Sequence, residues 1–305
     1  MISILLAFPA LLATEATGVT PAITTELTES RSVLFTADRG RHVLLQRVPG
    51  AECAGKLRLS ADGEAVICRA PPLEAEPHQH FVGRQLVLHG ADQSCLVEVT
   101  EISLITWYEQ EDGIRRAGSA QAAWERAAYD DRFVAARVKS VDGRRCPGAR
   151  WAEEVESQSH LQVGHSPERA EQKEAVARFR RHPGHAALQA RFEAETGRTG
   201  MWDDAQVRVR VLPTRTGQFV FAGAQVGGCG EFSADFWVIW QVSSQGDYTV
   251  LTDSDVVGGW FEPEALVERP DGRPTFFDAH LRVEPRGAGY QVVEDVAVST
   301  WSCPC

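Results

Sequence analysis

The 305-residue sequence has no asparagine and only three lysines, Lys56, Lys139 and Lys173. The absence of asparagine excludes N-glycosylation, because the acceptor is an Asn followed two positions later by Ser or Thr. Lys and Asn have AT-rich codons, so we interpret the bias toward arginine as that of a high-GC bacterial genome. This bias carries no information about the fold.

The sequence also lacks a C-x-x-C motif, since none of its seven cysteines belongs to such a pair. Zinc ribbons and thioredoxin-like redox sites need that spacing, so the sequence predicts neither. It also lacks a legible phosphate-binding loop, paired-carboxylate motif or complete catalytic triad, and no cofactor is expected. Dispersed single cysteines are typical of disulfides in an exported protein.

Negative charge dominates the chain, with a formal net charge of −11. Residues 201–305 hold fifteen acidic residues and seven arginines. A surface of this sign repels phosphate backbones and anionic lipid, so we expect no nucleic-acid partner. The contents of 43% hydrophobic and 24% charged residues are those of a soluble globular protein.

The sequence begins with an apolar run, Ile2 to Ala13, followed by small residues up to Ala16. We expect residues 1–16 to be a signal peptide and 17–30 a flexible lead, which predicts a secreted or periplasmic protein with no integral membrane segment in its mature form. No Lys or Arg precedes the run, which leaves open a start codon further upstream. The alternative is a buried N-terminal strand or helix.

The export hypothesis makes the cysteines disulfide candidates. Cys53 and Cys68 flank a predicted hairpin whose turn contains Asp62-Gly63, so we expect them to pair. Cys95 and Cys146 would join the end strands of the first module. Cys229 would pair with Cys303 or Cys305, and the cysteine left over, Cys305 in the first case, could link two chains into a dimer.

The hydrophobic pattern predicts a mainly β protein with some helix, of the α+β class. Residues 31–160 are expected to form a β-rich module with one helix over Ser119 to Tyr129. Residues 161–200 would form a helical connector, beginning with Ser166 as N-cap and ending at Gly197. Residues 201–305 would form an antiparallel β module centred on 236–240, a strand buried on both faces. Each module could be a sandwich, a small barrel or a blade-like sheet.

His78 and His80 resemble half of a zinc site, because alternate residues in an extended chain can point the same way. A catalytic zinc needs a third protein ligand, for which the spacing singles out none of Glu74, Glu76, His89 and His160. The commoner interpretation of this segment is a solvated, proline-rich loop.

Residues 253–264 match part of a calcium-loop template through Asp253, Asp255 and Glu264. Val257 replaces the acid or amide expected at the fifth position, and the neighbouring segments are predicted strands, so an acidic surface loop is the alternative. Trp260 lies in the same stretch beside two glycines. It is the residue we would test as an exposed platform for a sugar or peptide ligand.

Three segments resemble stretches of uncharacterised exported proteins of high-GC proteobacteria such as myxobacteria. They are the Cys229-Gly230-Glu231-Phe232 turn leading into 236–240, the Asp271-Gly272-Arg273-Pro274 turn, and the segment 146–152. The resemblance covers about half of the chain in scattered pieces. It implies export but no particular activity.

The leading hypothesis is therefore an exported, disulfide-stabilised binding or structural-interaction protein without catalysis, whose partner is an unidentified protein or glycan. The alternative is an extracytoplasmic zinc hydrolase that uses His78 and His80. The first rests on missing motifs, and distant residues can still assemble a site that spacing does not show.

Overall fold

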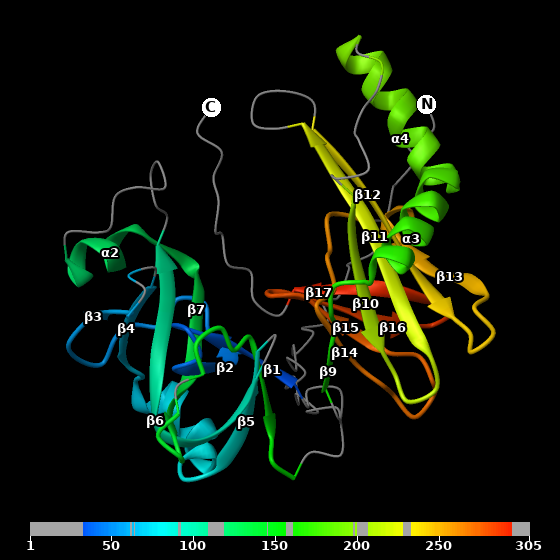
Figure 1. The fold of residues 1–305 in the computed structure, drawn as a ribbon. Helices are drawn as coiled ribbons and strands as arrows, with labels where there is room; N and C mark the ends of the chain where they lie inside the picture. The colour runs from blue at the N-terminus through cyan, green and yellow to red at the C-terminus, as the bar shows by residue number, and fades with distance from the viewer. Residues whose placement is uncertain are drawn as a thin grey trace, which may run out of the picture. The chain divides into compact units, whose positions relative to one another are not determined.

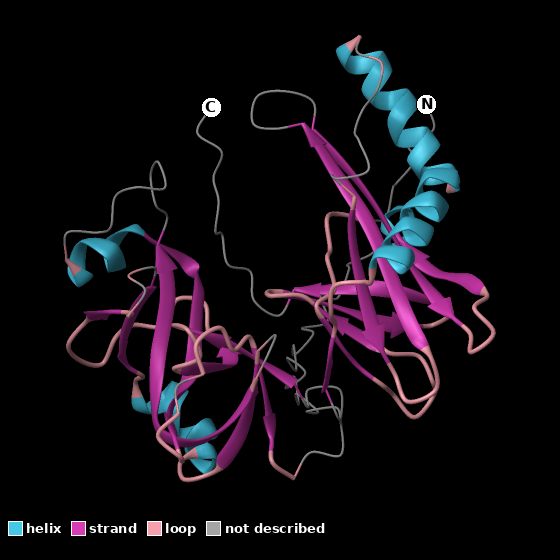
Figure 2. Ribbon diagram, in the orientation of Figure 1, coloured by secondary structure: helices cyan, strands magenta, loops and turns pink. Residues whose placement is uncertain are grey.

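The computed structural model describes residues 33–294 except 62, 64, 91–92, 109–118, 145, 157–160, 198, 200–206 and 228–232. The fold is mainly β with a few helices, as the sequence predicts. Figure 1 labels the elements, and Figure 2 shows how strands outweigh helices. No helix in the described part of the chain is both long and apolar enough to span a membrane.

The first part of the chain forms a closed barrel of six antiparallel strands. The strands follow the order β6, β5, β8, β1, β2, β7, and β7 pairs with β6 to close the ring. Their bounds are β1 (Val33–Ala37), β2 (His42–Arg47), β5 (Gln85–His89), β6 (Ser94–Tyr108), β7 (Ala127–Ser140) and β8 (Trp151–Glu154). The closed ring removes the exposed edges that an open sheet would leave.

Alternation along the strands gives the barrel an inner and an outer apolar face. Leu86, Leu88 and Val97 belong to the cluster that fills the inside, whereas Phe133 and Trp151 belong to a second cluster on the outside. The helix α2 (Ala120–Arg126) comes after β6 in the chain, and the Ser119 hydroxyl accepts the Ala122 N–H at its start. The helix predicted over Ser119 to Tyr129 is therefore present but shorter, with Ser119 as its N-cap.

One side of β6 is shared by two different strands, because at 15 residues it is longer than any neighbour. Its first part pairs with β5, and its last part pairs with β4 (Ala65–Arg69), which in turn pairs with β3 (Arg58–Leu59). Between β4 and β5 the chain forms α1 (Pro72–Ala75) and the 3₁₀ helix η1 (Glu76–Phe81). The predicted proline-rich loop is thus helical, since proline at the first positions of a helix gives up no backbone hydrogen bond.

The rest of the chain is layered around a four-stranded sheet. The sheet has the order β10 (Arg208–Pro213), β11 (Gln218–Gly227), β12 (Ser233–Val242), β13 (Tyr248–Asp253). Phe236, Val238 and Trp240 of β12 pack toward the helices α3 (Arg169–Arg181) and α4 (Pro183–Thr196). Trp237 and Ile239 face the opposite way, into a second cluster. The strand predicted to be buried on both faces is confirmed.

A five-stranded antiparallel sheet covers that opposite face, with Phe261, Leu266 and Phe276 against Trp237. Its order is β17 (Gly289–Glu294), β16 (Leu281–Arg286), β15 (Thr275–Phe277), β14 (Ala265–Val267), β9 (Leu161–Val163). Strands β15 and β16 are separated by a turn at residues 278–280, in which Asp278 accepts two backbone N–H groups.

The segment 161–200 is more than the connector that the sequence predicts. Its first residues form β9, which completes the five-stranded sheet by pairing with β14. Its two helices bury Phe179 and Phe192 against the four-stranded sheet. The N-cap of α3 is Glu168 rather than Ser166, because Glu168 and Glu171 form a reciprocal capping box. The predicted end at Gly197 is correct, and Gly197 has the left-handed conformation that favours glycine (φ 67°).

The five-stranded sheet also packs on the outside of the barrel. Phe277 contacts Phe35, with ring centroids 6.3 Å apart, and the Trp151 indole donates a hydrogen bond to the Asp278 carbonyl at 3.0 Å. Leu161, Ala265 and Val267 join the same apolar cluster as the outer face of the barrel.

Gly184 provides a test of the packing between α4 and β12. A Cβ atom at this position would lie 2.2 Å from Cε2 of Phe236, whose ring is held by Phe179 and His182. We expect Gly184→Ala to lower the unfolding free energy by about 1–3 kcal/mol, although alanine favours helix by about 1 kcal/mol. Urea titration measures this. Gly289→Ala, where the added methyl meets open space, is the control, and equal stability of the two variants would contradict the packing described.

Asp278 provides a test by pH. Burial raises the pKa of its carboxyl to about 6, against the opposing backbone hydrogen bonds from His280 and Leu281. The folded protein therefore binds more protons than the unfolded chain between about pH 4 and 6, so this group makes stability fall as pH rises through that window, by on the order of 2 kcal/mol. Asp278→Asn keeps the acceptor oxygen but cannot ionise.

We expect the difference in unfolding free energy between Asp278→Asn and the wild type to grow from pH 4 to pH 7 in favour of the variant. Chemical denaturation across this range measures it. Asp247→Asn, which alters an exposed carboxyl, is the control. A difference that stays constant with pH would show that the ionised carboxylate costs nothing in the folded state.

Candidate functional site

A groove of about 950 Å³ lies on the barrel where β4 and β5 part along β6. Between the two pairings, residues 100–102 of β6 face the gap, and a register shift between Val99 and Glu101 bends the strand at this point. The β3–β4 side and the α1–η1 segment form the two walls. The lining residues are Lys56, Arg58, Cys68, Arg69, Ala70, Pro72, Ala75, Glu76, Gln79, Val82, Thr100, Glu101 and Ile102.

The Cys53–Cys68 disulfide fixes one wall of the groove. Its Cα atoms are 5.9 Å apart, and the Ala54 N–H donates a hydrogen bond to the Arg69 carbonyl. The loop that precedes β3 is thereby held against β4, whose last residue, Arg69, lines the groove. The wall is fixed by a covalent bond as well as by packing.

Positive charge gathers in this groove although the whole chain is acidic. Arg58 and Arg137 both donate hydrogen bonds to Glu101, at 3.1 and 3.0 Å. Burial would raise the pKa of Glu101, but these two hydrogen bonds outweigh it and lower the pKa. Lys56 and Arg69 have no ion-pair partner among the residues that the structure describes. These two cations are therefore available to an acidic group of a ligand.

The two histidines of the proposed zinc site lie in η1, beside the groove. His78 Nε2 lies 2.9 Å from the Gln46 side-chain oxygen, and His80 Nδ1 lies 2.9 Å from the Pro77 carbonyl. Burial, and then the charge of His80, lower the pKa of His78. In a 3₁₀ helix, residues two apart do not share a face as they do in a strand.

Among the described residues, no three His, Cys, Asp or Glu side chains come together as a metal site. Glu74 and Glu76 lie on α1 and η1, and His160 lies outside the described residues. His89 contacts Glu153 of the neighbouring strand β8. A zinc ion on His78 and His80 stays a prediction.

The residues of the proposed calcium loop serve other contacts. Asp253 caps the short helix α5 (Ser254–Val257) by accepting the Val256 N–H at 3.1 Å. Asp255 lies on that helix and is exposed. The Glu264 carboxylate pairs with the Arg150 guanidinium on the barrel side. The sequence match missed this arrangement because the helix replaces the coil that a calcium loop needs.

Trp260 is half-buried and is not an exposed platform. Its ring packs edge-on against Phe221 with centroids 6.1 Å apart, and the Arg208 guanidinium lies 5.7 Å from its centroid. Glycine at 223 makes room for the ring, since a Cβ there would lie 3.1 Å from it. Trp260 thus contributes to the core beneath β11.

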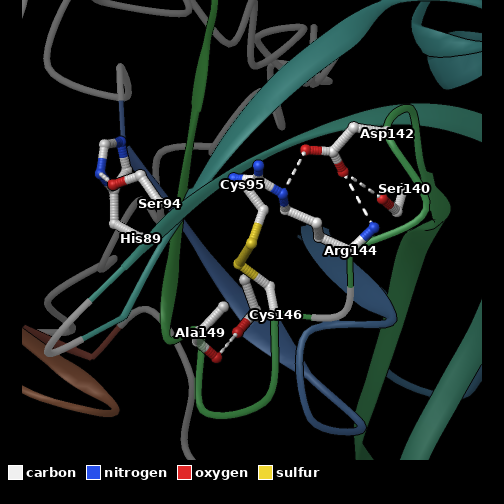
Figure 3. The surroundings of a disulfide bond; sticks show 9 residues. His89, Ser94, Cys95, Ser140, Asp142, Arg144, Cys146 and Ala149 are labelled. Atoms are coloured by element: carbon white, nitrogen blue, oxygen red, sulfur yellow. Dashed lines mark hydrogen bonds and ion pairs between the residues drawn. A yellow bond between two sulfur atoms is a disulfide. The ribbon is translucent and has the colours of Figure 1, made fainter.

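Both predicted disulfides of the barrel are present, Cys53–Cys68 and Cys95–Cys146. The second joins the start of β6 to the loop after β7, where Asp142 accepts hydrogen bonds from Ser140 and Arg144, as Figure 3 shows. Cys229, Cys303 and Cys305 lie outside the described residues, so their pairing and the proposed dimer stay predictions.

Comparison with known proteins gives no match: no family model, no curated protein and no solved structure resembles the chain. The sequence predicted the hairpin and the disulfide of the groove, but it gave no signal for the gap along β6. That gap depends on which strands pair with β6, and sequence spacing alone does not show that β4 and β5 both pair with the same side of β6.

Removal of the Cys53–Cys68 disulfide tests its role as a wall. A bridge closing a loop of 15 residues contributes about 3 kcal/mol, so Cys53→Ser/Cys68→Ser should lose about that much stability. Hydrogen exchange should accelerate at residues 53–58 and stay unchanged at β5. Cys95→Ser/Cys146→Ser, a bridge of separation 51, is the control, and faster exchange at 53–58 in that variant alone would contradict the assignment.

Proposed function

We propose that this is an exported, disulfide-stabilised binding protein whose groove takes a short acidic segment of a protein partner. The observation that carries the proposal is the concentration of Lys56, Arg58 and Arg69 along one groove of a chain whose net charge is −11. Arg58 is paired with Glu101, whereas Lys56 and Arg69 have no carboxylate partner among the described residues. Unpaired cations in a concave site are expected to bind an anionic group.

The size and chemistry of the groove favour a peptide over a single ion. A volume of about 950 Å³ matches the upper range of ligand sites, and far exceeds what one carboxylate fills. Ala70, Ala75, Val82 and Ile102 supply apolar contact, and the Gln79 and Thr100 side chains can hydrogen-bond. Glu76 supplies the one lining carboxylate that has no ion-pair partner in the described part of the chain, so it would favour a basic or neutral group at that end.

Charge also limits the length of the ligand. At physiological salt, electrostatic interactions between exposed charges are screened beyond about 8 Å. An acidic group inside the groove therefore feels chiefly the local cations, whereas a long polyanion would extend over the acidic surface of the rest of the chain. The charge distribution therefore disfavours nucleic acid as the partner and favours a short segment.

Export is supported by the two disulfides of the barrel. Such bonds persist in oxidising compartments and are rare in the cytosol. The apolar run at residues 1–16 would supply the signal peptide, with the mature protein secreted or periplasmic. The zinc hydrolase gains no support from the geometry of His78 and His80.

Charge reversal in the groove tests the binding function. We expect a short fluorescein-labelled oligoglutamate peptide to bind the protein and to bind Lys56→Glu/Arg69→Glu at least roughly tenfold more weakly. Fluorescence anisotropy measures both. Affinity should also fall as salt rises, because the contacts are ionic.

Lys173→Glu is the matched control, since it reverses a lysine exposed on α3, outside the groove. It should bind the peptide as the wild type does. Equal weakening by both variants would mean that net charge alone matters, which contradicts the groove. Tighter binding of a sulfated oligosaccharide than of the peptide would assign the groove to an acidic glycan.

A further inference from the structure

A serine, a histidine and a glutamate line up at the closed end of the β5–β6 hairpin. His89 is the last residue of β5, Ser94 is the first of β6, and the two are cross-strand partners. Ser94 precedes Cys95, whose disulfide to Cys146 anchors this end of the hairpin, as Figure 3 shows. The pair is therefore held by strand register and by a covalent bond.

The distances between the three side chains are those of a proton relay. Ser94 Oγ lies 3.1 Å from His89 Nδ1, and His89 Nε2 lies 3.0 Å from Glu153 Oε2. The second contact has ion-pair distance without the alignment of a linear hydrogen bond. A carboxylate at Nε2 favours the tautomer with its proton there, which leaves the Nδ1 lone pair toward the serine hydroxyl.

Burial increases from the serine to the glutamate. Ser94 is exposed, the His89 side chain is 15% exposed, and Glu153 is 6% exposed. The Leu161 N–H donates to the same Glu153 oxygen at 3.3 Å, and Glu153 is fixed in β8 opposite Val87. The acid is thus rigid and screened from water, while the hydroxyl is open to a substrate.

We propose that Ser94, His89 and Glu153 form a nucleophilic relay that hydrolyses small, unhindered carboxylic esters. Ser94 and His89 would be the catalytic residues, and Glu153 would be a positioning residue for the imidazole. The three residues share none of the groove's lining, so this activity goes beyond the binding function. It also departs from the non-catalytic role that the sequence favours.

The reaction has two halves. Ser94 Oγ attacks the ester carbonyl while its proton passes to His89 Nδ1. The tetrahedral adduct then expels the alcohol, which takes that proton, and the acyl group stays on Ser94. In the second half, water gives a proton to Nδ1 and attacks the acyl carbon, and the carboxylic acid leaves as the proton returns to Ser94.

The sequence could not point to this relay from spacing alone. His89 and Ser94 are five residues apart across a turn, and Glu153 arrives from a strand 59 positions after Ser94. Only the pairing of β8 with β5 brings the carboxylate to the imidazole. The sequence marked His89 only as a candidate zinc ligand, whereas in the structure His89 contacts Ser94 and Glu153.

A fluorophosphonate probe tests the nucleophile directly, because it bonds to an activated serine oxygen with loss of fluoride. We expect mass spectrometry of the labelled wild-type protein to place the probe on Ser94 and Ser94→Ala to take none. Ser140→Ala, which removes another hydroxyl near the same disulfide, should label as the wild type does. No label on wild-type Ser94 would overturn the proposal.

Turnover of p-nitrophenyl acetate tests the roles of the other two residues. His89→Gln should lower kcat/KM roughly a hundredfold or more. Glu153→Gln should lower kcat and shift the midpoint of the pH–rate profile, with Glu153→Asp restoring part of both, which a merely structural role would not do. Wild-type rates in Ser94→Ala or in His89→Gln would overturn the relay. Circular dichroism and oligoglutamate binding confirm that each variant is folded.

Discussion

The hydrogen bonding between β6 and β7 closes the barrel, and every functional feature of the barrel depends on it. β6 pairs with β7 along nearly its whole length, from Val97 to Tyr108. The opposite edge of β6 pairs with β5 along its first part and with β4 along its last part. The start of β6 carries Ser94 and Cys95, which forms the disulfide to Cys146. The register shift in the middle of β6 lies at the groove, and the end of β6 pairs with β4 of the β3–β4 wall. One long strand with a register shift organises both sites.

The sequence predicts best where a pattern is local. Strand β12 is recognisable because aromatic and β-branched residues fill both of its faces, and Ser119 and Gly197 are recognisable as helix ends from their own chemistry. The same local logic fails where two signals compete. Ser166 and Glu168 both can cap α3, and the capping box with Glu171 decides in favour of the second.

Features that depend on distant pairing are not predictable from one sequence. The groove needs β4 and β5 to part along β6, and the Ser94–His89–Glu153 relay needs β8 beside β5. The Cys53–Cys68 disulfide was the exception, since cysteines flanking a hairpin report a contact that the turn already enforces. Sequence spacing suggested metal ligands at His78 because it assumed an extended chain where the structure has a 3₁₀ helix.

Strand β9 has a consequence for how such a gene can change. Residues 161–163 complete a sheet whose other four strands all lie after residue 264, and the helices between them cover the other sheet. Recombination anywhere between β9 and β14 would separate these pieces and expose the apolar surfaces that they cover. The region from β9 to β17 is therefore expected to be inherited as a single evolutionary unit rather than as exchangeable cassettes.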